Sequence, residues 1–200
     1  MAQVILPKYS EGPVNTGEKR LVEFLKNSLP DSYYVIPNGE YAFKNPKGVI
    51  QFWEYDCIVV APHAIYHIEN KDWNGELIGD DNSWFVNSAE RRNPHKTASY
   101  KTRLLASKLA VKNPSWRKAR IITLVTLSYP GQSVLGIDPE SACYQQTFTL
   151  TTSLTSFIKD SDLIEKDPDE IAEYQKDIVD FLVGHQQRGL MSKEQRSMVT

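Results

Sequence analysis

Residues 54–76 read EYDCIVVAPHAIYHIENKDWNGE, and this stretch decides the fold. The runs 50–60 and 64–71 are rich in β-branched and aromatic residues, a composition typical of strands. Because only a short Ala-Pro-His-Ala segment joins the two runs, they predict an antiparallel hairpin. Ionisable residues nevertheless occur at its open end, although buried strands ordinarily carry none. The hairpin is therefore the first place to look for a functional site.

The register of this hairpin is expected to bring charged residues together. If the turn is symmetric, Ala61 faces Ala64, and Asp56 then lies directly opposite Glu69. Lys71 follows two residues after Glu69, so it projects to the same face of the sheet. Directly opposed residues have Cβ atoms about 4.5–5.5 Å apart. We therefore expect Asp56, Glu69 and Lys71 to form one cluster.

Two opposed carboxylates repel each other and prefer water or a cation between them. Mg²⁺ and Mn²⁺ are hard cations that take oxygen ligands, often one or two carboxylates with water and phosphate. The expected ligands are Asp56, Glu69 and the main-chain carbonyl of Asn70. Lys71 would orient or deprotonate an attacking water and stabilise the charge that develops on a phosphate. The alternative is a solvated hairpin edge, where Lys71 and Glu54 form a surface ion pair worth about 0–1 kcal/mol.

A first helix is predicted from about Asn15 to Leu29, before Pro30. Glu18 projects from the inward edge of its apolar stripe, and two roles are consistent with that position. In a capping box, Asn15 is the N-cap and Glu18 is the acid at the third helical position. In the other role, Glu18 contacts the ligands of the metal or helps to hold a second ion.

The net charge of −2 conceals an uneven distribution along the chain. Residues 91–120 contain ten lysines and arginines and neither aspartate nor glutamate. Such a segment indicates either a surface for a polyanion or a solvated helix face. The candidate contacts to such a polyanion are Arg91, Arg92, Lys96, Lys101 and Lys108. Lys101 and Lys108 are expected away from the core side of their helix.

The whole chain predicts a mixed α/β protein, with a central sheet flanked by helices. The core is expected over residues 1–160, and residues 161–200 are expected to form a C-terminal helical extension, open toward a downstream domain. Before the hairpin we expect a strand over 33–36 and a loop over 37–48. After it we expect a meander over 72–87, a helix from Asn93-Pro94 to 111 and a central strand over 121–129. An edge strand over 143–150, a helix over 152–159 and a last helix capped by Asp167-Pro168 complete the expected elements.

Cysteine usage and hydropathy indicate the compartment. Cys57 and Cys143 belong to no paired-cysteine motif, so neither a zinc site nor a structural disulfide is expected. The longest apolar run is too short to span a bilayer, and the N-terminus lacks the features of a signal peptide. We therefore expect a cytoplasmic protein that makes no membrane contact.

Several segments together resemble the NERD (nuclease-related) domain family. They are Gly17-Glu18, residues 29–33, residues 54–62, residues 68–75 with Trp84, and Asn93-Pro94 at a helix start. The resemblance implies a fold of the PD-(D/E)xK restriction-nuclease superfamily. It implies Glu18, Asp56, Glu69 and Lys71 as the catalytic residues, with Mg²⁺-dependent cleavage of DNA as the activity. The chain departs from the family at one point, because His-Lys-Thr follows Asn93-Pro94 where these domains usually have a glutamine.

Domains of this family are typically part of larger bacterial proteins that also carry a kinase or helicase, and some kinase fusions belong to phage defence. The resemblance therefore implies a metal-dependent DNA endonuclease or nickase that acts in phage defence or DNA processing. The alternative is a catalytically weak module that binds DNA or a partner and regulates an attached domain such as a kinase. A third reading is a dimerisation or sensor domain, so a homodimer is among the expected assemblies.

Overall fold

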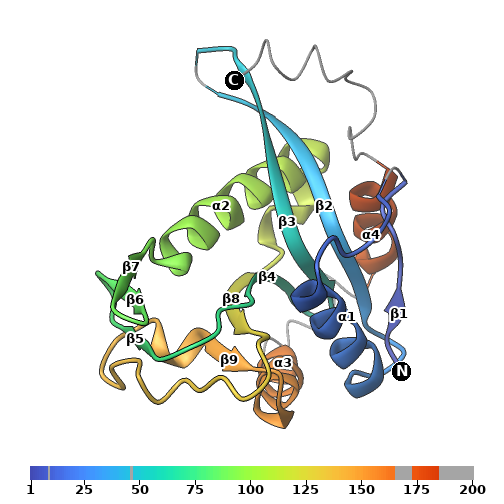
Figure 1. The fold of residues 1–200 in the computed structure, drawn as a ribbon. Coiled ribbons are helices and arrows are strands. Elements are labelled where there is room, and N and C mark those ends of the chain that lie inside the picture. Colours follow the sequence, from blue (N-terminus) through green and yellow to red (C-terminus); the bar gives the residue numbers. More distant parts are fainter. Residues whose placement is uncertain (9, 46, 165–172, 185–200) are drawn as a thin grey trace.

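A curled mixed sheet forms the centre of the molecule in the computed structural model, which describes residues 1–8, 10–45, 47–164 and 173–184 (Figure 1). Across the sheet the described strands are β1 (Gln3–Val4), β2 (Tyr34–Lys44), β3 (Ile50–Val60), β4 (Ile65–Lys71), β8 (Ile121–Leu127) and β9 (Thr147–Thr149). The three neighbours β2, β3 and β4 are antiparallel, and β4, β8 and β9 are parallel. The short β1 pairs in parallel with β2 at the edge.

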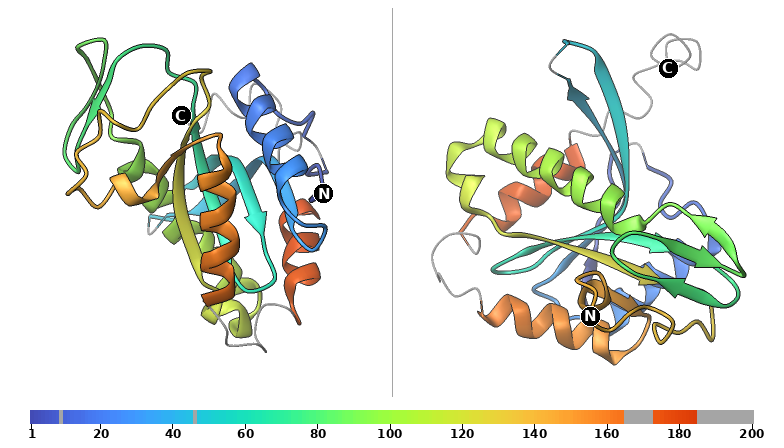
Figure 2. Two further views of the ribbon diagram at one scale, coloured as in Figure 1. Left: turned by 90° about the horizontal axis from the view of Figure 1, so that it is seen from below. Right: turned by 90° about the vertical axis from the view of Figure 1, so that its left-hand side faces the viewer.

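Helices cover both faces of this sheet. One face carries α1 (Thr16–Ser28) and α3 (Thr152–Ile164), and the other carries α2 (Pro94–Lys112) and α4 (Gln175–Gly184). Alternate residues of a strand point to opposite faces, so Cys57 and Val59 pack with α1 and α3, whereas Ile58 and Val60 pack with α2 and α4. The right-hand view of Figure 2 shows the sheet between these layers. The predicted α/β class with a restriction-endonuclease-like arrangement is confirmed.

The residues predicted as a meander, 72–87, form a separate small sheet together with residues 89–91. Its strands are β5 (Leu77–Gly79), β6 (Trp84–Val86) and β7 (Ala89–Arg91), and all neighbouring pairs are antiparallel. Trp84 is fully buried and packs with Leu127 at the end of β8. This small sheet therefore covers the large sheet at the C-terminal ends of the parallel strands β4 and β8.

The predicted loop over 37–48 is wrong, because β2 continues to Lys44. Asn38 takes a left-handed backbone conformation (φ 50°), and its Nδ2 donates a hydrogen bond to the carbonyl of Gly12 (2.9 Å). This local break explains why the Pro-Asn-Gly pattern indicated the end of a strand. Beyond it, residues 39–44 pair with 50–55, and the hairpin extends from the body of the molecule as an arm (Figure 1).

The later elements also differ in length from the predicted ones. The edge strand is only Thr147–Thr149, because residues 144–146 form the 3-10 turn η2 (Tyr144–Gln146). A second 3-10 segment, η1 (Pro114–Lys118), follows α2. The helix α3 continues past residue 160 to Ile164, and the predicted cap at Asp167-Pro168 lies outside the described residues. No helix in the described part of the chain is long and apolar enough to cross a membrane.

Candidate active site

The predicted register of the central hairpin is confirmed. Cys57 pairs with Ile68 and Val60 with Ile65, and the turn closes with a hydrogen bond from the Ala61 amide to the Ala64 carbonyl (2.9 Å). The described ladder ends at Cys57, one residue before Asp56. The strands therefore separate where the charged residues begin.

Asp56 lies at a break in the pairing on both sides of β3. On the β2 side, Pro37 pairs with Cys57 and Gly39 with Tyr55, and the left-handed Asn38 lies between these two pairs. On the β4 side, Asp56 Oδ2 accepts a hydrogen bond from the Asn70 amide (2.7 Å), which replaces a main-chain pair. No hydrogen bond from the described residues reaches Asp56 Oδ1, so this oxygen is available to a ligand.

Glu69 is held by two lysines. Lys71 Nζ donates to Oε1 and Lys101 Nζ donates to Oε2, each at 2.7 Å. Burial alone would raise the pKa of Glu69, but the two ammonium groups more than reverse this effect and leave the pKa below its ordinary value. Burial and repulsion from Glu69 raise the pKa of Asp56 to about 6. The site thus contains one carboxylate that is firmly ionised and one that resists ionisation.

The sequence-based placement of Lys101 away from the core side of its helix is wrong. Lys101 is 7% exposed, and fully buried residues lie one turn before it (Ala98) and one turn after it (Leu105). The Tyr55 hydroxyl donates to the Lys101 carbonyl (2.7 Å), and the Tyr55 ring centroid lies 5.8 Å from Lys101 Nζ. Lys101 lies three residues after Ala98 and four before Leu105, a spacing that places all three on one face of the helix. This spacing in the sequence could have predicted that Lys101 points toward the core.

Glu18 is occupied at the N-terminus of α1. The N-cap Asn15 accepts a hydrogen bond from the Glu18 amide (2.9 Å), while the carboxylate accepts from the Val14 amide (2.7 Å) and from Asn15 Nδ2. Asn15 is therefore the N-cap, as in the predicted capping box, but the Glu18 carboxylate reaches the amide of Val14 in place of that of Asn15. No hydrogen bond within the described residues joins Glu18 to the carboxylates of the hairpin.

The start of α1 nevertheless lies against the end of the central strands. A Cβ on Gly17 would come within 2.6 Å of Ser128 Oγ and 2.7 Å of Asp72 Cβ, so the close approach requires glycine. Arg20 strengthens the contact, because its Nε donates to the Ser128 carbonyl (2.9 Å) and its guanidinium pairs with Asp72. These contacts fix α1 beside the residues that follow Lys71.

The side chains next to the carboxylates in the strand are used structurally. Asn70 points to the opposite face, where its Nδ2 donates to Ser128 Oγ (3.0 Å) and its Oδ1 accepts from Thr126 Oγ1 (2.9 Å). Only the main-chain carbonyl of Asn70 is left as a candidate ligand. His67 is completely buried, with Nδ1 2.8 Å from Thr102 Oγ1 and its ring 4.8 Å from that of Tyr55. It is therefore a packed histidine of the core.

A hard divalent cation fits the donors that remain. Within the described residues, no group of three or more histidine, cysteine, aspartate or glutamate side chains could hold a metal ion. The two carboxylates of Asp56 and Glu69 do, however, lie close enough for Glu69 to raise the pKa of Asp56. Mg²⁺ commonly uses one or two carboxylates and keeps several waters. The pair therefore suits Mg²⁺ better than a metal that needs a full set of protein ligands.

The five candidate DNA contacts do not form one exposed surface. Arg91, Arg92 and Lys96 are exposed, whereas Lys101 is buried against Glu69. Lys108 is half-buried, and its Nζ donates to the Ala42 carbonyl (3.0 Å). Some cations of residues 91–120 therefore make contacts within the folded protein, and others form a charged surface.

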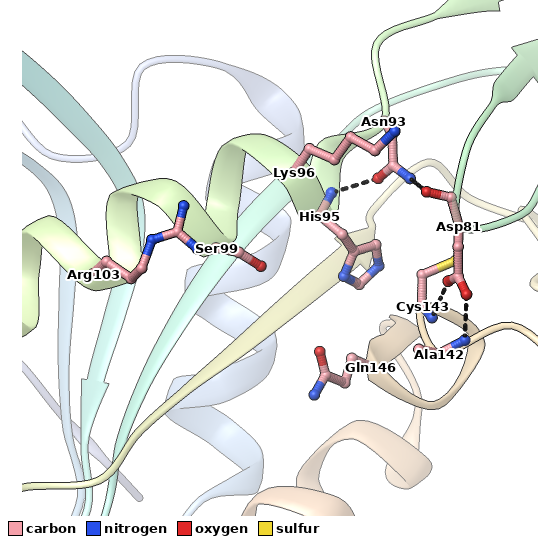
Figure 3. A pocket seen from close by; sticks show the side chains of 9 residues that line it. All are labelled: Asp81, Asn93, His95, Lys96, Ser99, Arg103, Ala142, Cys143 and Gln146. Carbon is pink, nitrogen blue, oxygen red and sulfur yellow. Dashed lines mark hydrogen bonds between the residues drawn. The ribbon is translucent and has the colours of Figure 1, made fainter.

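A cleft of about 450 Å³ opens beside the N-terminal half of α2 (Figure 3). Its lining residues are Asp81, Asn93, His95, Lys96, Ser99, Arg103, Ala142, Cys143 and Gln146. The carboxylate of Asp81 accepts hydrogen bonds from the amides of Ala142 (3.1 Å) and Cys143 (3.0 Å). Lys96 precedes Lys101 by five residues, which rotates it by about 140° around the helix. The cleft and the carboxylates therefore lie on different sides of α2.

Comparison with known families gives one match. A family model described as "Nuclease-related domain" matches residues 13–128, which include the whole hairpin, α1, α2 and β8. Neither the comparison with curated proteins nor that with solved structures gave a match.

Proposed function

Since the chain belongs to the nuclease-related domain family, we propose that it is a divalent-metal-dependent nuclease that hydrolyses phosphodiester bonds in DNA. The observation that carries the proposal is the cluster at the open end of the hairpin. There Asp56 has a free carboxylate oxygen, and Lys71 donates to the neighbouring carboxylate of Glu69. Both carboxylates and the lysine fall within the matched residues.

Asp56 and Glu69 would hold Mg²⁺, or Mn²⁺ in its place, together with the carbonyl of Asn70. When bound there, the cation would supply Lewis-acid stabilisation of the phosphate and make a coordinated water more acidic. Lys71 is the more exposed of the two lysines, with 24% of its side chain accessible, so its ammonium group can reach a phosphate or a water. It would orient the attacking water and stabilise charge on the phosphate. Glu18 would support the site from α1.

Arg91, Arg92 and Lys96 are the exposed cations that would contact the DNA backbone, because phosphate contacts supply most of the non-specific affinity. Endonuclease or nickase activity in phage defence or DNA processing remains part of the proposal. So do a fused kinase or helicase, a homodimer, and a location in the cytoplasm. The unit would comprise residues 1–160 with a helical extension.

A cleavage assay on supercoiled plasmid tests this function. Nicking or cutting is expected with Mg²⁺ or Mn²⁺ and not with EDTA. Lys71→Met should lower the rate by about 10²–10³-fold, the usual cost of losing one group that stabilises charge in the transition state. The matched control is Lys19→Met at an exposed position of α1, which should leave the rate unchanged. Cutting that persists in EDTA, or in Asp56→Asn, would refute the proposal.

A DNA-binding module without catalysis is the second candidate. It is favoured by the engagement of both Glu69 oxygens by ammonium groups. It is also favoured by the His-Lys-Thr run after Asn93-Pro94, where related domains usually have a glutamine. This candidate predicts salt-dependent binding of DNA and no cleavage with any divalent metal. A binding titration run beside the cleavage assay separates the two functions.

A further inference from the structure

The two lysines that hold Glu69 come from very different surroundings. Lys71 is the last residue of β4, where the chain leaves the sheet, and 24% of its side chain is exposed. Lys101 lies in the middle of α2, and only 9% of its side chain is exposed. Their contacts to Glu69 have the same length, 2.7 Å, so distance does not distinguish them. The two lysines differ in how far each side chain is exposed to water.

Releasing either lysine from Glu69 has a different consequence. If Lys71 moved away, its ammonium group could be hydrated or could meet an anionic substrate at the surface. If Lys101 moved away, its ammonium group would stay in a buried pocket with the ring of Tyr55 as a neighbour (5.8 Å). A buried charge that has lost its partner is strongly unfavourable. The hydrogen bond from the Tyr55 hydroxyl to the Lys101 carbonyl also fixes the backbone at this point.

We propose that Lys101 is a permanent anchor for Glu69 Oε2, and that Lys71 is an exchangeable partner of Oε1 which an incoming divalent cation displaces. This inference rests on the proposed function, because it takes Glu69 to be a metal ligand. Lys101 is then a positioning residue and makes no contact with DNA. At Oε1 a divalent cation takes the place of a monovalent ammonium group, so Glu69 keeps a cationic partner throughout the exchange. It also delivers the freed ammonium group of Lys71 to the site only when the metal is present.

The inference is tested by NMR on the full chain with ¹³C at the lysine ε-carbons, with Mg²⁺ as the titrant. Signals are assigned from Lys71→Met and Lys101→Arg. The Lys71 signal should move in a saturable way, and the Lys101 signal should move severalfold less. In Glu69→Gln, the saturable response should disappear. A larger response of Lys101 than of Lys71, or equal responses, would overturn the inference.

Calorimetry with Mg²⁺ gives an independent result that needs no catalysis. Lys71→Met should bind Mg²⁺ about tenfold more tightly, because no ammonium group competes for Oε1. Weaker or unchanged binding in Lys71→Met would refute the exchange while leaving the metal-dependent function intact. Absence of Mg²⁺ binding in the wild type would refute the inference and the proposed function together. The two failures are thus distinguishable.

Discussion

Acidification should destabilise the protein through His67. This side chain is completely buried, and burial lowers its pKa from 6.5 to about 3. In the unfolded chain the ring takes up a proton near pH 6.5, whereas in the folded chain it stays neutral. The unfolded state therefore binds more protons below pH 6.5, and stability falls as the pH falls through this window.

The size of the effect follows from the width of the window. From pH 6.5 to about pH 5 is about 1.5 pH units, and each unit is worth about 1.4 kcal/mol, so His67 should cost about 2 kcal/mol. His95 acts in the same direction, because burial lowers its pKa to about 4. Asp56 acts in the opposite direction, because its pKa is raised to about 6 and the folded state then binds the extra proton. A variant with no titratable group at position 67 keeps the contributions of His95 and Asp56. The difference in pH dependence between the wild type and this variant is therefore the contribution of His67.

The assay is urea denaturation at about pH 7 and about pH 5, for the wild type and His67→Gln. The glutamine is polar enough to keep a hydrogen bond to Thr102 but takes up no proton. The wild type should lose about 2 kcal/mol more than the variant between the two pH values. If both proteins lost the same free energy of unfolding between the two pH values, the pKa of His67 would not differ between the folded and unfolded states.

Three further predictions concern packing and charge. Gly17→Ala should lower the free energy of unfolding by about 1–3 kcal/mol, measured by urea denaturation, because its Cβ would overlap the strand ends beside α1. Leu105→Ala should lower it by about 2–5 kcal/mol in the same measurement, since this fully buried residue packs α2 onto the sheet. Replacing Arg91, Arg92 and Lys96 by serine should reduce the salt slope of DNA binding by up to about 3 without lowering stability; an unchanged slope would exclude these residues as phosphate contacts.

The central part of the fold could be predicted because its information is local. The β3–β4 turn is four residues long, so its symmetry defines the register, and the register brings Asp56 toward Glu69. The capping partners of Glu18 also lie within four residues along the chain. Where residues close in the sequence determine the structure, the sequence pattern was sufficient to predict it.

The remaining features depend on contacts between distant segments. Lys101 meets Glu69 only because α2 crosses the sheet at that point, 32 residues further along the chain. The length of β2 was missed because Asn38 stabilises a left-handed break with a hydrogen bond to Gly12, 26 residues away. A short strand pattern interrupted by Pro-Asn-Gly resembles a loop until such a tertiary contact is known.

The parallel pairing of β4 with β8 determines when Lys101 completes the carboxylate site during folding. The β3–β4 hairpin closes over a few residues, but β4 pairs with β8 only after residues 72–120 have folded back across the sheet. Pairing over such a long separation is slow, because chain entropy is lost before the contacts form. Lys101 is carried within that connection, so it reaches Glu69 late. A nascent or partly refolded chain would therefore hold Asp56 and Glu69 side by side before the buried lysine arrives to compensate their charge.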